Sequence, residues 1–368
     1  MFCASNLYPF LKSLRYIEAV AVKSCSSAAR ALLLVCLVTI LLVPACKRGA
    51  LQTNEVAYVA APQVNLRDRL AAIYNRVGTA SNGERVEILE RQKRFAKVRT
   101  AAGLEGWVEQ RYLVSEETFE AFQKLAEENR ETPGQGQGAT RAALNMHITP
   151  ARDSEKLYQL SEAEKVQILK RATAERPSKQ QPAVKPVATD GGAPEQPKLY
   201  DDWWLVRNSQ GRIGWVLARM VDLDVPLEIA QYSEGQRIMG AYVINKLQDG
   251  DKQVPQYLVL FSENKDGMPF DYNQARVFTW NFRKSRYETA YRERGLAGYL
   301  PVTVATENFE REGTLPTFTL RVRLQDGTIA DRKYKLNQPI VRRVLAPGEQ
   351  RQILAPSPKS DTRKRRSR

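Results

Sequence analysis

The residues that could carry chemistry are few. The 368-residue chain has one histidine, His147, and its four cysteines all lie within the first 46 residues. Residues 47–368 therefore offer no thiol for a Cys–His nucleophilic pair or for a zinc site built from histidine and cysteine. A Ser-His-Asp triad would depend on His147 alone, which we expect to pack or to face water on a strand. We expect no metal site.

Carboxylates are the remaining catalytic candidates. The chain has 41 Asp and Glu residues, so a carboxylate pair for glycoside hydrolysis stays open, but no spacing indicates one. Gly134, Gly136 and Gly138 alternate without the following helix that a phosphate-binding loop requires. We therefore expect a protein that binds rather than catalyses, and one that uses no cofactor.

Aromatic and arginine residues alternate between positions 257 and 299. Phe278, Trp280 and Phe282 are spaced by two, so in a strand they share one face. The sequence favours a buried core face, and an aromatic platform for sugar rings or extended polymers is the alternative. The interleaved cations are Arg276, Arg283, Arg286, Arg292 and Arg294.

The N-terminal segment has the pattern of a targeting sequence. Residues 31–45 are uncharged and follow a basic stretch, and as a helix they would rise about 22 Å, short of the roughly 30 Å bilayer core. This pattern predicts a signal peptide over residues 1–45. Val43-Pro44-Ala45-Cys46 resembles the lipobox of bacterial lipoproteins, which implies that Cys46 is acylated and begins the mature chain. An uncleaved membrane anchor and an ordinary signal peptide are the alternatives.

The predicted export determines which partners the positive net charge of the chain favours. The formal charge is +15, and removing four basic residues and one acidic residue with the leader leaves +12. The basic tail, residues 346–368, is expected to be a disordered arm that contacts anionic lipid, and no nucleic-acid partner is expected outside the cytosol. Lys47 stands where many inner-membrane lipoproteins have aspartate, so the resemblance favours the periplasmic side of the outer membrane over the inner membrane.

An internal repeat organises the middle of the chain. Residues 65–66 and 86–89 recur 80 positions later, whereas residues 98–99 and 106–108 recur 108 positions later. Two constant offsets indicate one module present twice, with a 28-residue insertion in the second copy. The insertion is rich in Pro, Gln and Lys, and it predicts a disordered loop over residues 172–199.

Two motifs of the first copy, V-N-L-R at 64–67 and V-R-T-x-x-G-x-x-G-W-V at 98–108, resemble the bacterial SH3-like domain. The resemblance implies two small, strongly bent barrels over residues 58–114 and 141–223. A tether would occupy residues 46–57. Ser115 suits a helix N-cap, and the spacing of apolar residues predicts a helix over 115–131 that packs on the first barrel. A partner-binding helix is the alternative, and residues 132–140 are expected to form a linker.

The same resemblance implies a ligand cleft lined by aromatic, arginine and asparagine side chains, with peptidoglycan or a peptide segment as ligand. Trp203 and Trp204 are adjacent and would point to opposite faces of a strand. We expect Trp204 to be exposed because it aligns with the small Ala96, whereas Trp203 aligns with Phe95. The candidate ligand-binding residues are Asn65, Arg67, Trp107, Tyr112, Trp204 and Trp215.

Residues 228–345 show no further repeat and resemble no family. Seven strand candidates and the Asp326-Gly327 hairpin signal predict an antiparallel β-sandwich or barrel, so the expected fold class is mainly β. The candidates are 238–247, 256–262, 275–282, 286–292, 299–306, 317–325 and 328–336. The favoured function is a membrane-anchored envelope lipoprotein that binds a cell-wall polymer or an envelope protein without catalysis. A structural or assembly protein that docks through the C-terminal domain is one alternative. A carbohydrate-active enzyme in residues 228–345 is the other.

Overall fold

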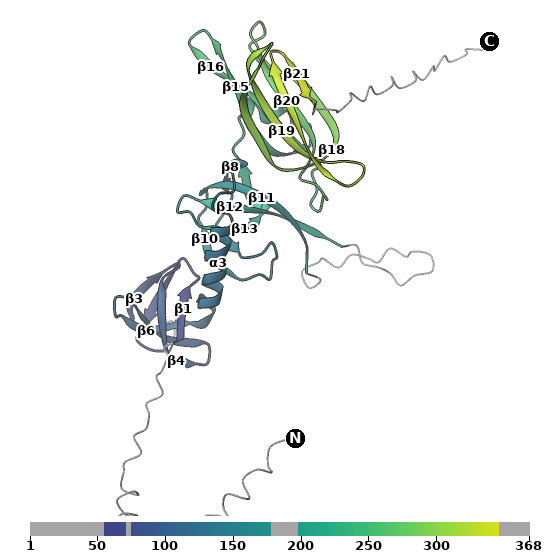
Figure 1. The fold of residues 1–368 in the computed structure, drawn as a ribbon. Coiled ribbons are helices and arrows are strands. Elements are labelled where there is room, and N and C mark those ends of the chain that lie inside the picture. Colours follow the sequence, from purple (N-terminus) through teal and green to yellow (C-terminus); the bar gives the residue numbers. More distant parts are fainter. Residues whose placement is uncertain (1–54, 71–74, 178–197, 346–368) are drawn as a thin grey trace, which may run out of the picture. The chain divides into compact units, whose positions relative to one another are not determined.

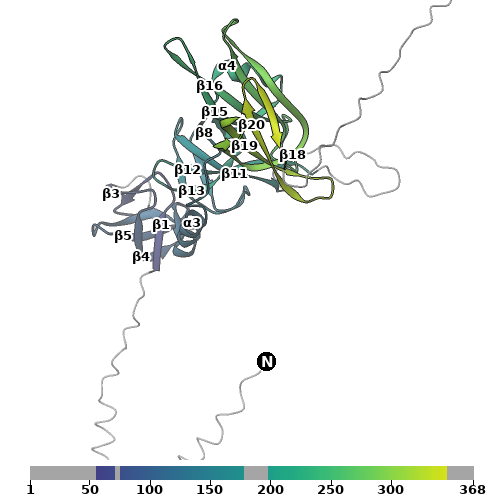
Figure 2. The same cartoon turned by 45° about the horizontal axis from the view of Figure 1, so that its top comes forward.

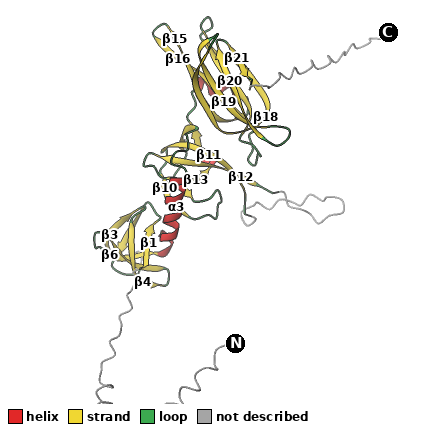
Figure 3. Cartoon of the chain, in the orientation of Figure 1, coloured by secondary structure: helices red, strands yellow, loops and turns green. Residues whose placement is uncertain are grey.

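Three antiparallel sheets follow one another along the chain in the computed structural model, which describes residues 55–70, 75–177 and 198–345 (Figure 1). Strands dominate, and α3 is the one long helix among the described residues (Figure 3). The expected mainly β class is confirmed. The signal peptide, Cys46, the insertion core and the basic tail lie outside the described residues.

The first sheet has seven strands in the order β3-β2-β6-β5-β4-β1-β7. Alternation in the first copy predicts strands over 64–67, 85–89, 96–99 and 106–108, and all four are present. Residues 55–57, expected in the tether, instead belong to β1, because that strand pairs with both β4 and β7. The strands are β1 (Glu55–Val59), β2 (Gln63–Arg67), β3 (Arg76–Ser81), β4 (Arg85–Gln92), β5 (Phe95–Thr100), β6 (Glu105–Glu109) and β7 (Leu113–Ser115).

Alternation along these strands builds the first core. Val64 and Leu66 of β2 are buried, whereas Asn65 between them is exposed. Buried aliphatic residues of β1, β4, β5 and β6 join them in one cluster. The inward positions thus hold the sheet together, and the side chains at the outward positions of β2 and β6 lie on the opposite face.

Helix α3 (Glu116–Glu128) follows the first sheet, with Ser115 accepting a hydrogen bond from the Thr118 N–H at 3.3 Å. Phe119 stacks on Tyr58 of β1 at a centroid distance of 3.8 Å, as expected for packing on the first module. Phe122 is fully buried and contacts Tyr158 of the second sheet edge-on at 5.4 Å. The helix therefore packs on both modules, because its apolar face is wider than one sheet covers.

The second sheet repeats the order of the first, as β10-β9-β13-β12-β11-β8-β14. Residues 136–140, expected in the linker, form β8 between β11 and β14. Gly138 permits this, since a Cβ atom there would lie 2.8 Å from the Asp222 carbonyl oxygen. The strands are β8 (Gly136–Thr140), β9 (Leu144–His147), β10 (Lys156–Leu160), β11 (Lys165–Glu175), β12 (Tyr200–Asn208), β13 (Ile213–Leu217) and β14 (Val221–Leu223).

Local irregularities recur in the two sheets as well. The register shifts past Leu89 between β4 and β5, and past Leu169 between β11 and β12. A Cβ atom on Gly106 would lie 2.7 Å from Leu66 Cβ, and one on Gly214 would lie 2.7 Å from Met146 Cβ. Both glycines therefore allow two strands to approach closely. In each sheet the strand order has two ends, and the structure shows no closed barrel among the described strands.

The expected disordered loop over residues 172–199 is wrong at both ends. Ala172 pairs with Trp203, and Glu175 pairs with Tyr200, so the insertion lengthens the β11–β12 hairpin. Main-chain pairing continues here because a long hairpin satisfies backbone groups that a loop would leave to water. Residues 178–197 lie outside the described residues.

The third sheet is a seven-stranded meander in the order β15 to β21 (Figures 1 and 2). Two predicted strands, 286–292 and 299–306, are one long strand, β18, whose first half pairs with β17 and whose second half pairs with β19. The Asp326-Gly327 hairpin is confirmed between β19 and β20. The strands are β15 (Arg237–Asp249), β16 (Lys252–Ser262), β17 (Tyr272–Asn281), β18 (Arg286–Phe309), β19 (Gly313–Arg323), β20 (Ile329–Asn337) and β21 (Ile340–Val344).

One face of the third sheet is covered by the preceding segment, which contains α4 (Leu227–Ala230). Ile229 of α4 is fully buried against Phe278, and Tyr232 contacts the same ring at 5.2 Å. The core interpretation is therefore confirmed for Phe278. Phe282 lies beyond the end of β17 and is 50% exposed, so the expected shared face does not extend to it.

A single cluster of buried apolar side chains connects the sheets. It runs from Tyr58 of the first sheet through Met146 of the second to Leu258 and Phe318 of the third. All described residues belong to one unit that begins at Glu55. The second sheet thus has a core continuous with that of the third sheet, whereas the core of the first sheet is a separate cluster that adjoins this one at Tyr58.

Candidate functional site

Four of the six predicted ligand-binding residues line one groove in the first sheet. Asn65 and Arg67 come from β2, Trp107 from β6, and Tyr112 from the 3-10 turn η1 (Gln110–Tyr112) that follows β6. The groove has a volume of about 220 Å³. Its remaining walls are formed by Gln63, Val64, Phe95, Val108 and Glu109.

Strand geometry places the two central residues together. Arg67 of β2 is the register partner of Trp107 of β6. Trp107 is flanked in its strand by buried Gly106 and Val108, so its own side chain points to the opposite, outer face. The ring is only partly buried. It therefore presents apolar surface to the groove as well as to the protein.

Hydrogen bonds of Gln110 and its neighbours hold two aromatic residues of the groove, Phe95 and Tyr112, in place. Its backbone N–H donates to the Arg94 carbonyl oxygen at 2.9 Å, and its side-chain Nε2 donates to the Phe95 carbonyl oxygen at 3.0 Å. The Tyr112 carbonyl oxygen accepts from the Ala60 N–H at 2.8 Å. The turn that carries Tyr112 is thus tied to the start of β5, and the two aromatic residues are held in place by main-chain contacts.

Arginine guanidinium groups lie over the rings of Tyr112 and Phe95. The Arg111 guanidinium lies 4.8 Å from the Tyr112 ring centroid and donates to the Tyr112 hydroxyl at 2.8 Å, while it also pairs with Glu109 at 2.8 Å. The Arg94 guanidinium lies 5.2 Å from the Phe95 ring centroid. Rings, amides and charges of both signs line the groove, which suits binding of a mixed polar and apolar ligand.

Phe95, Gln63 and Glu109 were not among the predicted residues. A signal for two of them is present in the sequence. Phe95 aligns with Trp203, and Gln63 alternates with Asn65 on the outer face of β2. Glu109 reaches the groove only because β6 ends there and η1 begins, which no residue pattern indicates.

The second copy does not repeat this groove. Trp215 pairs with His147 in the same register as Trp107 with Arg67, but the neighbouring surface is filled. The Trp203 ring contacts the His147 ring edge-on at 5.2 Å, and Trp203 is 1% exposed. The His147 ring nitrogen Nδ1 faces the Ser154 carbonyl oxygen at 3.1 Å, and burial lowers the pKa of His147.

The expected exposure of Trp204 is wrong. Trp204 is 3% exposed and belongs to the buried cluster that connects the sheets. The alignment of Trp204 with Ala96 in fact indicates an inward position, because Ala96 is itself fully buried. The larger residue at this inward position is packed into the core and does not turn outward.

In the second copy the arginine that corresponds to Arg111 binds a buried carboxylate and not a tyrosine. Arg219, the counterpart of Arg111, binds Asp201 at 3.0 Å, and Arg152 and Arg176 bind the same carboxylate at 2.5 and 2.8 Å. Burial raises the pKa of Asp201, but hydrogen bonds from Arg152 and Arg176 outweigh it, so the pKa lies well below the usual carboxyl range.

Across 55–70, 75–177 and 198–345, no group of three His, Cys, Asp or Glu residues could hold a metal ion. Within those ranges no helix has the length and apolar character that crossing a bilayer requires.

Residues 62–114 match the bacterial SH3 domain family, and this segment is therefore a bacterial SH3 domain. It contains the groove described above. The match covers less than half of the chain, so the family describes this segment alone. No curated protein matches the chain.

Three solved structures share a weak likeness with the chain. NlpC2 from Trichomonas vaginalis is 10% identical with a TM-score of 0.16, covering 80% of this chain and 96% of its own. NlpC1 from the same organism is 12% identical with a TM-score of 0.16, covering 67% and 94%. An NlpC/P60 family protein from Bacillus cereus is 9% identical with a TM-score of 0.20, covering 77% and 95%. TM-scores this low support no argument about fold or function.

Proposed function

We propose that this chain is a lipid-anchored protein of the bacterial cell envelope whose first SH3 domain binds peptidoglycan or a peptide segment without catalysis. The observation that carries the proposal is the groove that brings Asn65, Arg67, Trp107 and Tyr112 together within the SH3 segment. They are four of the six candidate residues that the sequence analysis named.

The groove suits a small unit of a polymer. Its volume of about 220 Å³ is below that of most drug-sized pockets, so it would hold one sugar or one or two amino-acid residues. Trp107 and Tyr112 offer ring faces, whereas Asn65 offers both a donor and an acceptor. Longer ligands would run along the surface on either side.

The second sheet is proposed to be a second SH3 domain that has lost the groove. Its strand order, its register shift at Leu169 and its close-approach Gly214 match the first sheet. Its outer face carries the packed Trp203 and His147 in place of an open aromatic surface. In this proposal the second copy connects the binding domain to the third sheet.

The anchor and the location are proposals that rest on residues 1–46. An acylated Cys46 would hold the described domains at a membrane, on the periplasmic side of the outer membrane by preference. Several acyl chains give lasting attachment, whereas a single chain gives only marginal attachment.

Binding to purified cell-wall sacculi tests the proposal. The full chain carrying Asn65→Ala should be retained several-fold less than wild type, because the variant loses a polar group of the groove. Asn65 is exposed, so its replacement leaves the core intact. Phe282→Ala removes an exposed ring in the third sheet and should leave retention unchanged. Equal retention of Asn65→Ala, Trp107→Ala and wild type would overturn the assignment of the groove.

A further inference from the structure

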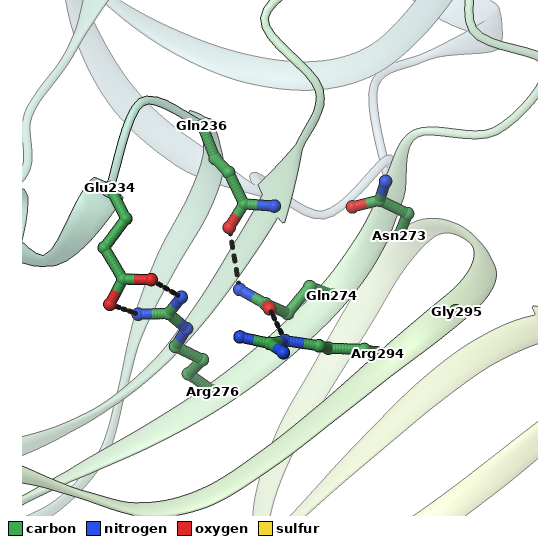
Figure 4. Close-up of a pocket in the computed structure, with 7 residues that line it drawn as sticks. All are labelled: Glu234, Gln236, Asn273, Gln274, Arg276, Arg294 and Gly295. Carbon is green, nitrogen blue, oxygen red and sulfur yellow. Dashed lines mark hydrogen bonds and ion pairs between the residues drawn. The ribbon is translucent and has the colours of Figure 1, made fainter. Parts of the chain in front are cut away.

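A second, fully polar pocket lies in the third sheet, away from the SH3 segment. It has a volume of about 430 Å³ and is formed where β17 and β18 meet the segment that enters β15 (Figure 4). Two arginines, one glutamate and three amides line it, and no apolar side chain does: Arg276, Arg294, Glu234, Gln236, Asn273 and Gln274.

Arg294 determines how two of the amides are oriented. Its Nε donates to Gln274 Oε1 at 3.0 Å, and a guanidinium can only donate. Gln274 must therefore present its Nε2 group to Gln236, whose Oε1 accepts at 2.9 Å. This leaves the Gln236 Nε2 group as a donor at the end of the series, which Figure 4 shows as consecutive dashed lines.

The two arginines have different roles. Arg276 is 1% exposed, and its guanidinium pairs with both carboxylate oxygens of Glu234, at 3.0 and 2.8 Å. Arg292 binds the same carboxylate at 3.3 Å, and Glu234 itself adopts a left-handed backbone conformation with φ 52°. Within the described ranges no carboxylate pairs with Arg294, so the pocket retains one uncompensated positive charge.

Asn273 adds an acceptor. Its Oδ1 atom is buried and has no hydrogen-bond partner within the part of the chain that the structure describes. A buried amide oxygen without a partner is uncommon, and a hydroxyl group of a ligand would satisfy it. The pocket therefore combines a cation, a free amide donor and an unsatisfied acceptor.

We propose that this pocket binds an acidic sugar, with the carboxylate of the sugar on Arg294 and its hydroxyls on Gln236 and Asn273. A charge-assisted hydrogen bond from Arg294 would supply most of the affinity, and the amides would recognise neighbouring hydroxyls. A lining without apolar side chains offers little to an apolar side chain of a peptide. The site is independent of the groove in the first sheet.

Titration of the isotope-labelled full chain with D-glucuronate, followed by NMR of the side-chain amides, tests the proposal. The amide signals of Gln236 and Asn273 should shift on saturation. D-glucose, which lacks the carboxylate, and acetate, which lacks the hydroxyls, should each bind at least about tenfold more weakly, because each satisfies only part of the site. Equal affinity for acetate and glucuronate would overturn sugar recognition, as would the absence of any shift.

Variants locate the site. Arg294→Gln should weaken glucuronate binding at least about tenfold, and Arg294→Lys, which keeps the charge, should restore part of it. Arg283→Gln makes the same charge change at the other end of the β17–β18 hairpin and should have no effect. Trp107→Ala should also leave glucuronate affinity unchanged, which separates this site from the sacculus-binding proposal. Wild-type affinity of Arg294→Gln would contradict the inference.

Discussion

The Arg171 guanidinium of the second sheet lies 3.3 Å from the carboxylate of Asp271, the residue before β17 of the third sheet, and both side chains are largely buried. The same guanidinium binds Asp202 at 2.7 Å and the Phe270 carbonyl oxygen at 2.9 Å. Burial raises the pKa of Asp271, and the Leu300 N–H and Arg171 oppose this effect. This contact connects a hairpin of the proposed second SH3 domain to the C-terminal domain.

Arg171→Met should destabilise the protein by roughly 3 kcal/mol or more, because it leaves two buried carboxylates with less compensation. Urea unfolding measures the change. Arg283→Met, at an exposed turn, should stay within about 0.5 kcal/mol of wild type. A loss below about 1 kcal/mol for Arg171→Met would show that the contact contributes little.

Asp201→Asn should change how stability depends on pH. The pKa of Asp201 is lower in the folded protein than in the unfolded chain, where it is about 4. The stability from this group is therefore complete above about pH 5 and is lost as the pH falls toward the folded pKa. Unfolding at pH 7 and pH 2.5 should show a smaller difference between variant and wild type at pH 2.5, and an equal difference would contradict the assignment.

Gly106→Ala and Gly214→Ala test whether the two sheets share an architecture. Each new methyl group would lie 2.7 Å from a side-chain Cβ of the neighbouring strand, so each variant should lose about 1–3 kcal/mol of unfolding free energy. Denaturation of the two variants side by side gives the comparison. A neutral effect at Gly214 alone would show that the close approach is not shared.

Cys46→Ser should release the protein from the membrane fraction, because the acylated cysteine is the proposed anchor. Fractionation and labelled palmitate incorporation measure this. Unchanged fractionation of the variant, or absence of label from wild type, would contradict the lipoprotein assignment. Ser115→Ala, which affects only the cap of α3, is the control and should remain with the membrane.

The sequence predicted the repeated strands well, because alternation such as Val64, Asn65 and Leu66 directly reflects which face is buried. It predicted β8 poorly. Gly136 and Gly138 have no side chain to alternate, and their pairing partners lie far along the chain. The joining of two predicted strands into β18 was missed for a related reason, since its two halves alternate separately against different neighbours.

The candidate groove was largely predictable and the polar pocket was not. Trp107 belongs to the motif at 98–108 and Tyr112 follows it closely, so a resemblance could point to both from sequence. Gln236 and Arg294 are 58 positions apart and meet only because β17 places Gln274 between them. The prediction that Trp204 is exposed was wrong, because a strand pattern assigns residues to two faces but does not show how large a side chain the core can hold.

Chemical-shift mapping with soluble peptidoglycan fragments tests the central proposal most directly. On titration of the labelled chain, the Trp107 indole and Asn65 amide signals should shift together at one affinity, while the Trp215 indole signal stays unchanged because its surroundings are already packed. Shifts confined to Trp215 and His147, or no shift at Trp107 at saturating fragment, would contradict the assignment of the first SH3 domain as the binding module.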